Sequence, residues 1–456
     1  MKVVLINIPF QKNKITRDMA GGLGFDATDQ TLLPPLDLLY YASVLRNKGH
    51  KVYLFDSEAE AIDSERLIER IIKINPDHII GEVSLPTIDN DTDFLKRLKQ
   101  QGSFCVIAKT SIPFKPILKE ILKRSQADFC LIPEVELIID KILLGKTNKG
   151  TARIINGRLV IFPLIPIDNL DKLPYPARDL LNNRVYRYPL LGNNCTIMQT
   201  SRGCPFPCAY YCPYPLVQGN KWRAMGVGRV YNEIVNIVEK HKIKRILFRD
   251  ATFTLDKNRI INICKLIIEK KLKVEWWCET RINCLDQELL TIMRKAGCEG
   301  INIGVETGDD QVMQSQGKPG VNLDKLKQIK LITDKINIKL HFLILIGLPE
   351  ESKKSLLQTF RLIKKLKPYS LGVTTVTPYP GTQLFKDALH NKWIETQDWN
   401  RYSGSLAAMH TEKLSSGDIR LAQKMIIGEI LLLQKGLLGQ IGLIIEEFIF
   451  RLWILL

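Results

Sequence analysis

Residues 200–215 read TSRGCPFPCAYYCPYP and carry Cys204, Cys208 and Cys212 in the spacing C-x3-C-x3-C. A short apolar run, CTIMQT, leads into them and is typical of a buried strand. Prolines beside the cysteines disfavour a helix, so a wrapped loop is predicted. Three thiolates on one loop at the end of a strand can converge on one metal cluster.

The spacing alone leaves three interpretations open. Three cysteines can ligate three irons of a [4Fe–4S] cluster and leave the fourth iron open for a substrate or cofactor. A closed zinc site would need a fourth ligand. Reduced thiols without any metal are the third interpretation. The catalytic cluster is favoured because an open coordination position suits chemistry.

Strand and helix patterns alternate outward from this loop over residues 191–400. The predicted strands are CTIMQT, RILFRD, VEWWCE, GINIGVE, KLHFLILIG and LGVTTVT. Six strand–helix units predict a partial (β/α)6 barrel of the TIM type. Polar side chains at the carboxyl ends of these strands are therefore the candidate site residues.

A second alternation precedes the barrel. Residues 1–145 predict an α/β domain with a Rossmann-like parallel sheet. Residues 146–190 are interpreted as a linker that contains a hairpin at Asn156-Gly157. Residues 401–456 are predicted to form a helical C-terminal segment.

The composition of the 456 residues is that of a globular protein, with 45% hydrophobic and 25% charged residues. The net charge of +17 suits an anionic partner, although the lysines are spread along the chain. The first residues run directly into a strand pattern without a signal peptide, which favours the reducing cytoplasm. The apolar stretch 437–456 is interrupted by charges, which disfavours a membrane span and leaves peripheral contact with a membrane open.

The segment SRGCPFPC, followed by aromatic residues and Cys-Pro, resembles the radical S-adenosylmethionine (radical SAM) superfamily. It is similar to the subgroup with an N-terminal cobalamin-binding-like domain. FRDATFTLDKNR, GINIGVETGDD, HFLILIGLPEES and TPYPGT resemble later strand motifs of that family in the same order. The resemblance covers about residues 1–400. It departs from the usual C-x3-C-x2-C loop, because Tyr210 and Tyr211 both precede Cys212.

This resemblance implies that S-adenosylmethionine (SAM) binds the open iron through its amino and carboxyl groups. One electron from the cluster then breaks the C–S bond and yields a 5′-deoxyadenosyl radical. The implied cofactor contacts lie at strand ends or beside the cluster. They are Tyr211, Asp250, Glu279, Arg281, Glu306, Gly308, Gly347 and Leu348.

Each of these residues has an expected role. Glu306 would bond a hydroxyl or the amino group, and Gly308 would permit close backbone approach. Gly347 and Leu348 would lie against adenine, as would Tyr211. Asp250 would face the same cavity. Glu279 and Arg281 would either hold the zwitterion of SAM or pair with each other.

Cobalamin is the third cofactor that the resemblance implies. Ser84 is the best contact candidate in the N-terminal domain. The loops at Ala108–Thr110 and Pro133–Val135 carry bulkier residues where the family has glycines. These side chains would crowd a buried cofactor tail, so a degenerate domain is the alternative.

The expected function is a radical SAM enzyme that methylates or rearranges a small molecule. The apolar C-terminus favours a lipid-like substrate, and a flavodoxin or ferredoxin would supply electrons. One alternative is a tRNA methylthiotransferase-like enzyme, although residues 405–456 lack the strands of its RNA-binding module. The other is a non-catalytic iron–sulfur or zinc protein that binds nucleic acid. No interleaved basic and aromatic stripe supports it, so nucleic acid is not the expected partner. No catalytic residue is assigned.

Overall fold

The computed structural model describes residues 1–10, 15–17, 24–26, 30–315, 322–433 and 436–455. The chain forms two compact units. The first unit contains Met1–Pro205 and Pro213–Leu247. The second unit contains Phe206–Cys212 and Phe248–Leu456.

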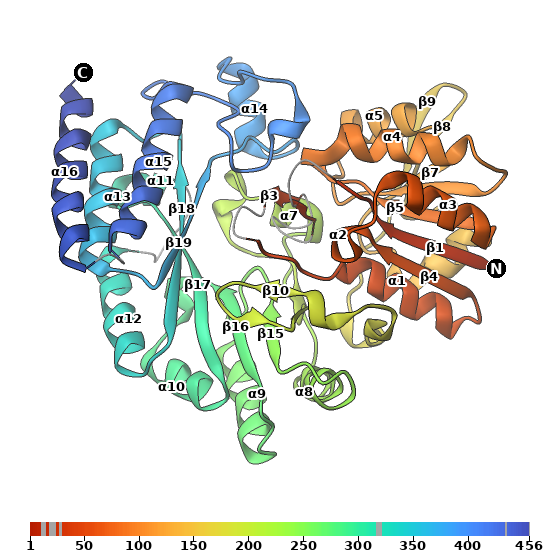
Figure 1. The fold of residues 1–456 in the computed structure, drawn as a ribbon, viewed down its shortest axis with the longest axis horizontal. Helices are drawn as coiled ribbons and strands as arrows, with labels where there is room; N and C mark the ends of the chain where they lie inside the picture. Colours follow the sequence, from red (N-terminus) through yellow and green to blue (C-terminus); the bar gives the residue numbers. More distant parts are fainter. Residues whose placement is uncertain (11–14, 18–23, 27–29, 316–321, 434–435, 456) are drawn as a thin grey trace. The chain divides into compact units, whose positions relative to one another are not determined.

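The first unit is built on a seven-stranded sheet with the order β4-β1-β5-β6-β7-β8-β9. Five neighbouring strands are parallel: β4 (Lys51–Asp56), β1 (Lys2–Asn7), β5 (His78–Glu82), β6 (Cys105–Lys109) and β7 (Phe129–Leu131). Helices cover the sheet, and they include α1 (Leu36–Asn47), α3 (Ser64–Ile74), α4 (Ile88–Lys99), α5 (Lys115–Ser125) and α6 (Ile139–Leu143). Figure 1 shows α4 and α5 on one side of the sheet and α1 on the other. Helices on both faces explain why the central strands are apolar throughout, and the predicted Rossmann-like domain is confirmed.

The predicted hairpin consists of β8 (Thr151–Ile155) and β9 (Arg158–Phe162), which pair antiparallel. Asn156 and Gly157 both have positive φ, 49° and 74°, as a tight primed turn requires. The interpretation of this hairpin as part of a linker is wrong. β8 pairs with β7, so the hairpin extends the first sheet.

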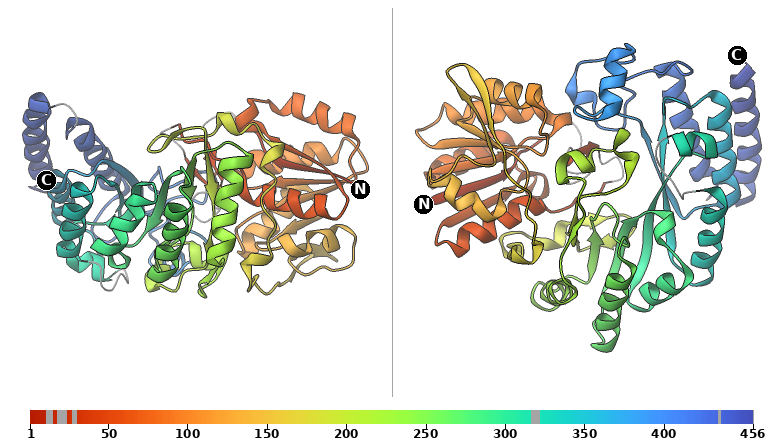
Figure 2. Two further views of the ribbon diagram at one scale, coloured as in Figure 1. Left: turned by 90° about the horizontal axis from the view of Figure 1, so that it is seen from below. Right: turned by 180° about the vertical axis from the view of Figure 1, so that it is seen from behind.

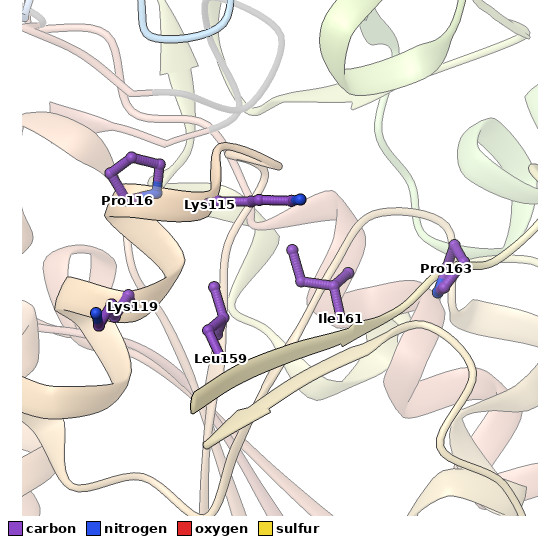
Figure 3. Close-up of a pocket in the computed structure, with 6 residues that line it drawn as sticks. All are labelled: Lys115, Pro116, Lys119, Leu159, Ile161 and Pro163. Atoms are coloured by element: carbon purple, nitrogen blue, oxygen red, sulfur yellow. The ribbon is translucent and has the colours of Figure 1, made fainter. Parts of the chain in front are cut away.

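A pocket of 670 Å³ lies beside this hairpin (Figure 3). Its lining comes from α5, β9 and the residue after β9, namely Lys115, Pro116, Lys119, Leu159, Ile161 and Pro163. None of these residues was predicted to bind a cofactor, and no candidate site residue lines the pocket. The pocket therefore contributes nothing to the candidate site.

The second sheet has the strand order β12-β15-β16-β17-β18-β19. β12 (Cys195–Met198) and most of β15 (Arg245–Phe248) belong to the first unit. The second unit holds four parallel strands: β16 (Glu275–Thr280), β17 (Cys298–Glu306), β18 (Lys339–Ile346) and β19 (Ser370–Thr375). α9 (Lys257–Glu269) precedes β16, and the strands are separated in sequence by helices that include α10 (Gln287–Lys295), α12 (Leu323–Lys335) and α13 (Lys353–Leu366). The strand order and the strand–helix alternation confirm the predicted partial barrel (Figure 1).

Two long helices end the chain, as predicted. α15 (Ser416–Leu433) packs beside β19, and the Gln423 side-chain amide donates to the carbonyl oxygen of Val373 at 3.1 Å. α16 (Gly436–Leu455) packs on α13 and α15 (Figure 2). No helix among the described residues is long and apolar enough to cross a membrane.

Candidate active site

The cysteine loop is divided between the two units. Cys204 belongs to the first unit, is buried, and donates its backbone N–H to the carbonyl oxygen of Gly219. Cys208 and Cys212 belong to the second unit, where the N–H of Cys212 donates to the carbonyl oxygen of Cys208 at 3.1 Å. All ten cysteines carry thiols and none forms a disulfide. Convergence of the three sulfurs on one cluster stays a prediction.

The start of this loop depends on Gly203. Its φ is +84°, and a Cβ atom there would lie 2.1 Å from the carbonyl oxygen of Lys221. Only glycine tolerates both conditions, so the Gly-Cys sequence is imposed by the turn. Over the described ranges, no three or more His, Cys, Asp or Glu side chains form a group suited to a metal ion.

Arg281 follows β16 and reaches the cysteine loop. Its Nη1 lies 3.5 Å from the sulfur of Cys208, and its guanidinium lies 3.9 Å from the ring centre of Phe206. Its Nη2 is buried and has no hydrogen-bond partner among the described residues. A buried guanidinium with an unused donor is costly unless a ligand completes it. The side chain therefore fits an anionic group beside Cys208.

Glu279 does not use Arg281 as its partner, so that interpretation is wrong. Arg249 Nη1 donates to Glu279 Oε1 at 2.6 Å, and Asn302 Nδ2 donates to the same oxygen at 3.3 Å. Trp277 Nε1 in turn donates to Asn302 Oδ1 at 2.6 Å. Sequence reasoning missed Arg249, although it stands beside Asp250 at the end of a strand. Glu279 is thus held by its own neighbours.

Tyr211 carries a second buried hydrogen-bond donor in the cysteine loop. Its ring packs in an apolar cluster with Leu348 and Leu345. Its hydroxyl is buried and lacks a partner among the described residues. Burial raises the pKa of the Tyr211 hydroxyl well above its usual range, and the charges of Glu306 and Cys208 raise it further. The hydroxyl therefore keeps its proton and acts as a donor.

Glu306 ends β17 in a strained conformation. Its φ is +65°, and the register between β17 and β18 shifts between Gly304 and Glu306. Left-handed backbone in a non-glycine residue persists only where the surroundings enforce it, and it is frequent at functional sites. The bulge re-aims the carboxylate at the carboxyl end of the barrel strand.

Gly308 has a different reason to be glycine. Its N–H donates to Thr359 Oγ1 at 2.8 Å, and an added Cβ would lie 2.5 Å from the Cα atom of Thr359. The close approach that glycine permits here is to α13. The structure accounts for Gly308 without a cofactor.

The Gly347–Leu348 turn after β18 is held by a buried carboxyl group. Both backbone N–H groups donate to Glu351 Oε2, at 2.7 and 3.1 Å. Burial raises the pKa of Glu351 to about 8. Glu351 was quoted in the motif GLPEES but was not recognised, because a charged residue in a loop is usually solvent-exposed.

Asp250 lies directly after β15 and is fully buried. Burial raises the pKa of the nearby Cys278 thiol well above its usual range, and the charges of Asp250 and Glu279 add to the shift. Ten of the twelve predicted site residues, Cys208 and Cys212 among them, belong to the second unit. Ser84 and Cys204 lie in the first unit.

Ser84 follows β5 and is fully buried. Its hydroxyl bonds Thr87 Oγ1 at 2.7 Å, and its N–H donates to Asp91 Oδ2 at 3.1 Å. Arg17 completes the group through Asp91 Oδ1 at 2.8 Å. The polar groups of Ser84 are thus used within its own unit.

The neighbouring strand ends are also filled. Lys109 is buried and pairs with Glu82 and Asp37, at 2.5 and 2.7 Å. Glu134 binds Arg223 through both carboxylate oxygens, at 2.6 and 2.7 Å. Val135 is wholly buried within the same unit. The described side chains at these two loops are paired with one another and do not fit a buried cobalamin tail. Binding of cobalamin by this chain stays a prediction.

The comparisons with known proteins agree with this fold. A family model of the radical SAM superfamily matches residues 198–363. An uncharacterized methyltransferase of Pyrococcus horikoshii is 30% identical over 402 residues, covering 85% of each chain. An anaerobic magnesium-protoporphyrin IX monomethyl ester cyclase of Cereibacter sphaeroides is 24% identical and covers 85% of this chain and 65% of its own. A hopanoid C-3 methylase of Methylococcus capsulatus is 24% identical and covers 83% and 73%.

Solved structures of cobalamin-dependent radical SAM enzymes have the same fold. Apo OxsB superposes with a TM-score of 0.76 at 17% identity, covering 99% of this chain and 72% of its own. TsrM of Kitasatospora setae, with tryptophan and a SAM analogue bound, has a TM-score of 0.67 at 15% identity, covering 87% and 77%.

The fold and these comparisons together define a radical SAM enzyme. The chain belongs to the radical SAM superfamily, in the subgroup with an N-terminal cobalamin-binding-like domain. Enzymes of this family take electrons from a reductant and act on small molecules, and the family implies a [4Fe–4S] cluster and SAM. The expectation of a non-catalytic binding protein is thereby set aside.

Proposed function

We propose that this enzyme cleaves SAM reductively at a [4Fe–4S] cluster held by Cys204, Cys208 and Cys212. The observation that carries the proposal is the pair of buried, unused donors on Arg281 and Tyr211 near Cys208. When bound, the cluster supplies the single electron that breaks the C–S bond of SAM. The remaining steps depend on how the chain binds SAM and excludes water.

Arg281 is proposed to bind the carboxylate of SAM through Nη2. A guanidinium fixed on Phe206 and beside Cys208 is pre-organised for this contact, because little side-chain entropy is lost on binding. Tyr211 would donate its hydroxyl to a polar group of the same ligand. Glu306 would accept from a hydroxyl or amino group.

The apolar side of the ligand would meet the turn after β18. Leu348 packs with Tyr211 in one cluster, and Glu351 fixes the two backbone N–H groups of Gly347 and Leu348. Such a turn offers a flat apolar face to adenine. Asp250 and Glu279 are proposed to stabilise the strand ends, since Glu279 is already bound by Arg249.

The substrate is proposed to be a lipid-like small molecule that is methylated or rearranged in the cytoplasm. Relatives named as a methylase of hopanoids and a cyclase of a porphyrin ester support a large apolar substrate. Ferredoxin or flavodoxin is the proposed electron donor. Cobalamin is not part of the proposed reaction, since the loops around Lys109 and Glu134 are filled by their own ion pairs.

The test is anaerobic reconstitution of the full chain with iron and sulfide, followed by reduction in the presence of SAM. We expect bound iron and sulfide, and formation of methionine and 5′-deoxyadenosine. SAM with a labelled methyl group would then show whether label enters lipids extracted from membranes. Zinc without iron in the purified protein, or reduced cluster without SAM cleavage, would contradict the proposal.

A further inference from the structure

The last helix, α16, exposes a stripe of large apolar side chains. The stripe consists of Ile444, Ile445, Phe448, Ile449 and Leu452. Ile444 is 65% exposed and Phe448 is 61% exposed. Their spacing places them on one face of the helix. Adjacent apolar residues that stay exposed mark a surface for interaction.

The opposite face of α16 anchors the helix to the barrel, so the stripe is a property of the folded unit. Phe450 is wholly buried against Phe360 of α13, with ring centres 5.5 Å apart. Trp453 Nε1 donates to Asp418 of α15 at 3.1 Å. Figure 1 shows α16 at the outer edge of the second unit, with α13 and α15 on one side of it. The helix therefore presents its stripe outward on a fixed base.

Basic side chains border the stripe. α13 carries five basic residues and no acidic one: Lys353, Lys354, Arg361, Lys364 and Lys365. α16 carries two acidic residues, Glu446 and Glu447. Glu447 is bound by Arg361, Lys364 and Arg451, at 3.2, 2.8 and 2.9 Å. These contacts lower the pKa of Glu447 to about 2, so its charge is fully matched. The side chains of Arg361 and Arg451 remain 46% and 58% exposed, and the three basic residues outnumber the two acidic ones, which leaves positive charge beside the apolar stripe.

We propose that this α16 stripe docks the enzyme on an anionic membrane surface. An interfacial helix buries its apolar face about 5–10 Å into the boundary between headgroups and acyl chains, while basic residues bind anionic headgroups. Both features lie side by side here. The inference goes beyond the proposed reaction and would place the enzyme where a lipid-like substrate is dissolved.

A second copy of the chain fits the α16 stripe less well than a membrane does. A stable dimer interface buries about 800 Å² on each partner. The stripe runs along about 12 Å of one helix and is bordered by like charges that would face each other in a symmetric pair. A shallow membrane contact needs neither the larger area nor an acidic partner surface.

The experiment is vesicle flotation of the reconstituted enzyme, with phosphatidylcholine vesicles compared with vesicles that also contain phosphatidylglycerol. We expect binding to the anionic vesicles that weakens as salt is raised. The double variant Ile444→Ser/Phe448→Ser should bind at least about tenfold more weakly. Leu331→Ser is the matched control, because Leu331 is 64% exposed on α12 of the same unit. Arg361→Gln/Arg451→Gln should lose the preference for anionic vesicles.

Several outcomes would overturn the docking proposal. The intact enzyme would fail to float with anionic vesicles, or the stripe variant would float like the intact enzyme. Light scattering that shows a dimer for the intact enzyme and a monomer for the stripe variant would assign the stripe to self-association. SAM cleavage in solution is measured in parallel, and it should be unchanged in the stripe variant. Failure of SAM cleavage in the intact enzyme and in every variant would count against the proposed function. The flotation result would still test membrane docking, because it does not depend on cleavage.

Discussion

The strand ends of the first sheet and those of β16 to β18 occupy equivalent places in two parallel sheets, and both carry charged side chains. At the ends of β5 and β6, Lys109, Glu82 and Asp37 satisfy one another. In the second unit, Arg281 and Tyr211 keep buried donor atoms without partners among the described residues.

Two strained glutamates sharpen this contrast. Glu134 has φ +66° and Glu306 has φ +65°. The strain at Glu134 is explained inside its own unit, because both its oxygens bind Arg223. Glu306 instead lies near the proton-bearing hydroxyl of Tyr211. Charges that pair with one another at a strand end indicate a structural role. Buried donor atoms without a partner among the described residues cost free energy and indicate a ligand site.

The largest expected effect is the loss of a cluster ligand. Cys208→Ala should abolish SAM cleavage, because two thiolates hold a [4Fe–4S] cluster poorly. Bound iron and 5′-deoxyadenosine are the two measurements. Cys284→Ala is the matched control, since Cys284 is a half-buried thiol of the same unit outside the cluster loop. Equal iron content in the two variants would remove Cys208 from the site.

Substitutions at the paired strand ends of the first sheet should lower the free energy of unfolding. Lys109→Met leaves Glu82 and Asp37 buried without their cation and should cost about 3–5 kcal/mol of unfolding free energy. Lys99→Met breaks the exposed pair with Asp128 and should cost less than about 1 kcal/mol. Urea unfolding measures both. A small loss of unfolding free energy in Lys109→Met would contradict this prediction. So would tight retention of cobalamin by the purified enzyme, because it would show that the strand ends of the first sheet are open to a ligand.

Substitutions at the strand ends of the second unit should lower the affinity for SAM. Arg281→Gln should weaken SAM binding by about 10- to 100-fold, the range for losing a charge-assisted hydrogen bond. Arg281→Lys should recover only part of the affinity, because lysine lacks the planar fork. Arg294→Gln is the control, as it breaks a surface pair with Glu299. Calorimetry with the reconstituted enzyme measures the affinities. Unchanged SAM binding in Arg281→Gln would contradict the assignment of Arg281 as a ligand contact.

A further effect concerns Glu351 and depends on pH. Its pKa of about 8 in the fold, against an ordinary 4.5, means that the folded enzyme holds a proton which the unfolded chain releases. The stability from this group is complete below about pH 4.5 and falls by about 1 kcal/mol per pH unit up to about pH 8. Glu351→Gln should match the intact enzyme near pH 5 and exceed its stability above pH 8. Parallel pH profiles of the two proteins in urea unfolding would contradict the assignment.

Much of the site could be predicted because its signals are local. The cysteine spacing and the polar residues after apolar runs are visible in the sequence, and parallel strands bring their carboxyl ends to one edge. The hairpin was placed in a linker because a turn signal does not say which strand the hairpin joins. Arg249 and Glu351 were missed because their partners are distant in sequence or buried by packing.

The sequence by itself determined the order of the elements, the Rossmann-like sheet, the partial barrel and the helical end, and it marked the candidate cluster loop. Periodicity, turn residues and thiolate spacing are properties of short segments, so no tertiary information was needed. Only the tertiary structure decided that Glu279 pairs with Arg249 rather than Arg281, that Gly308 serves packing on α13, and that the α16 stripe stays exposed. Those outcomes depend on which side chains compete for the same partner or surface, and that competition exists only once distant segments are packed together.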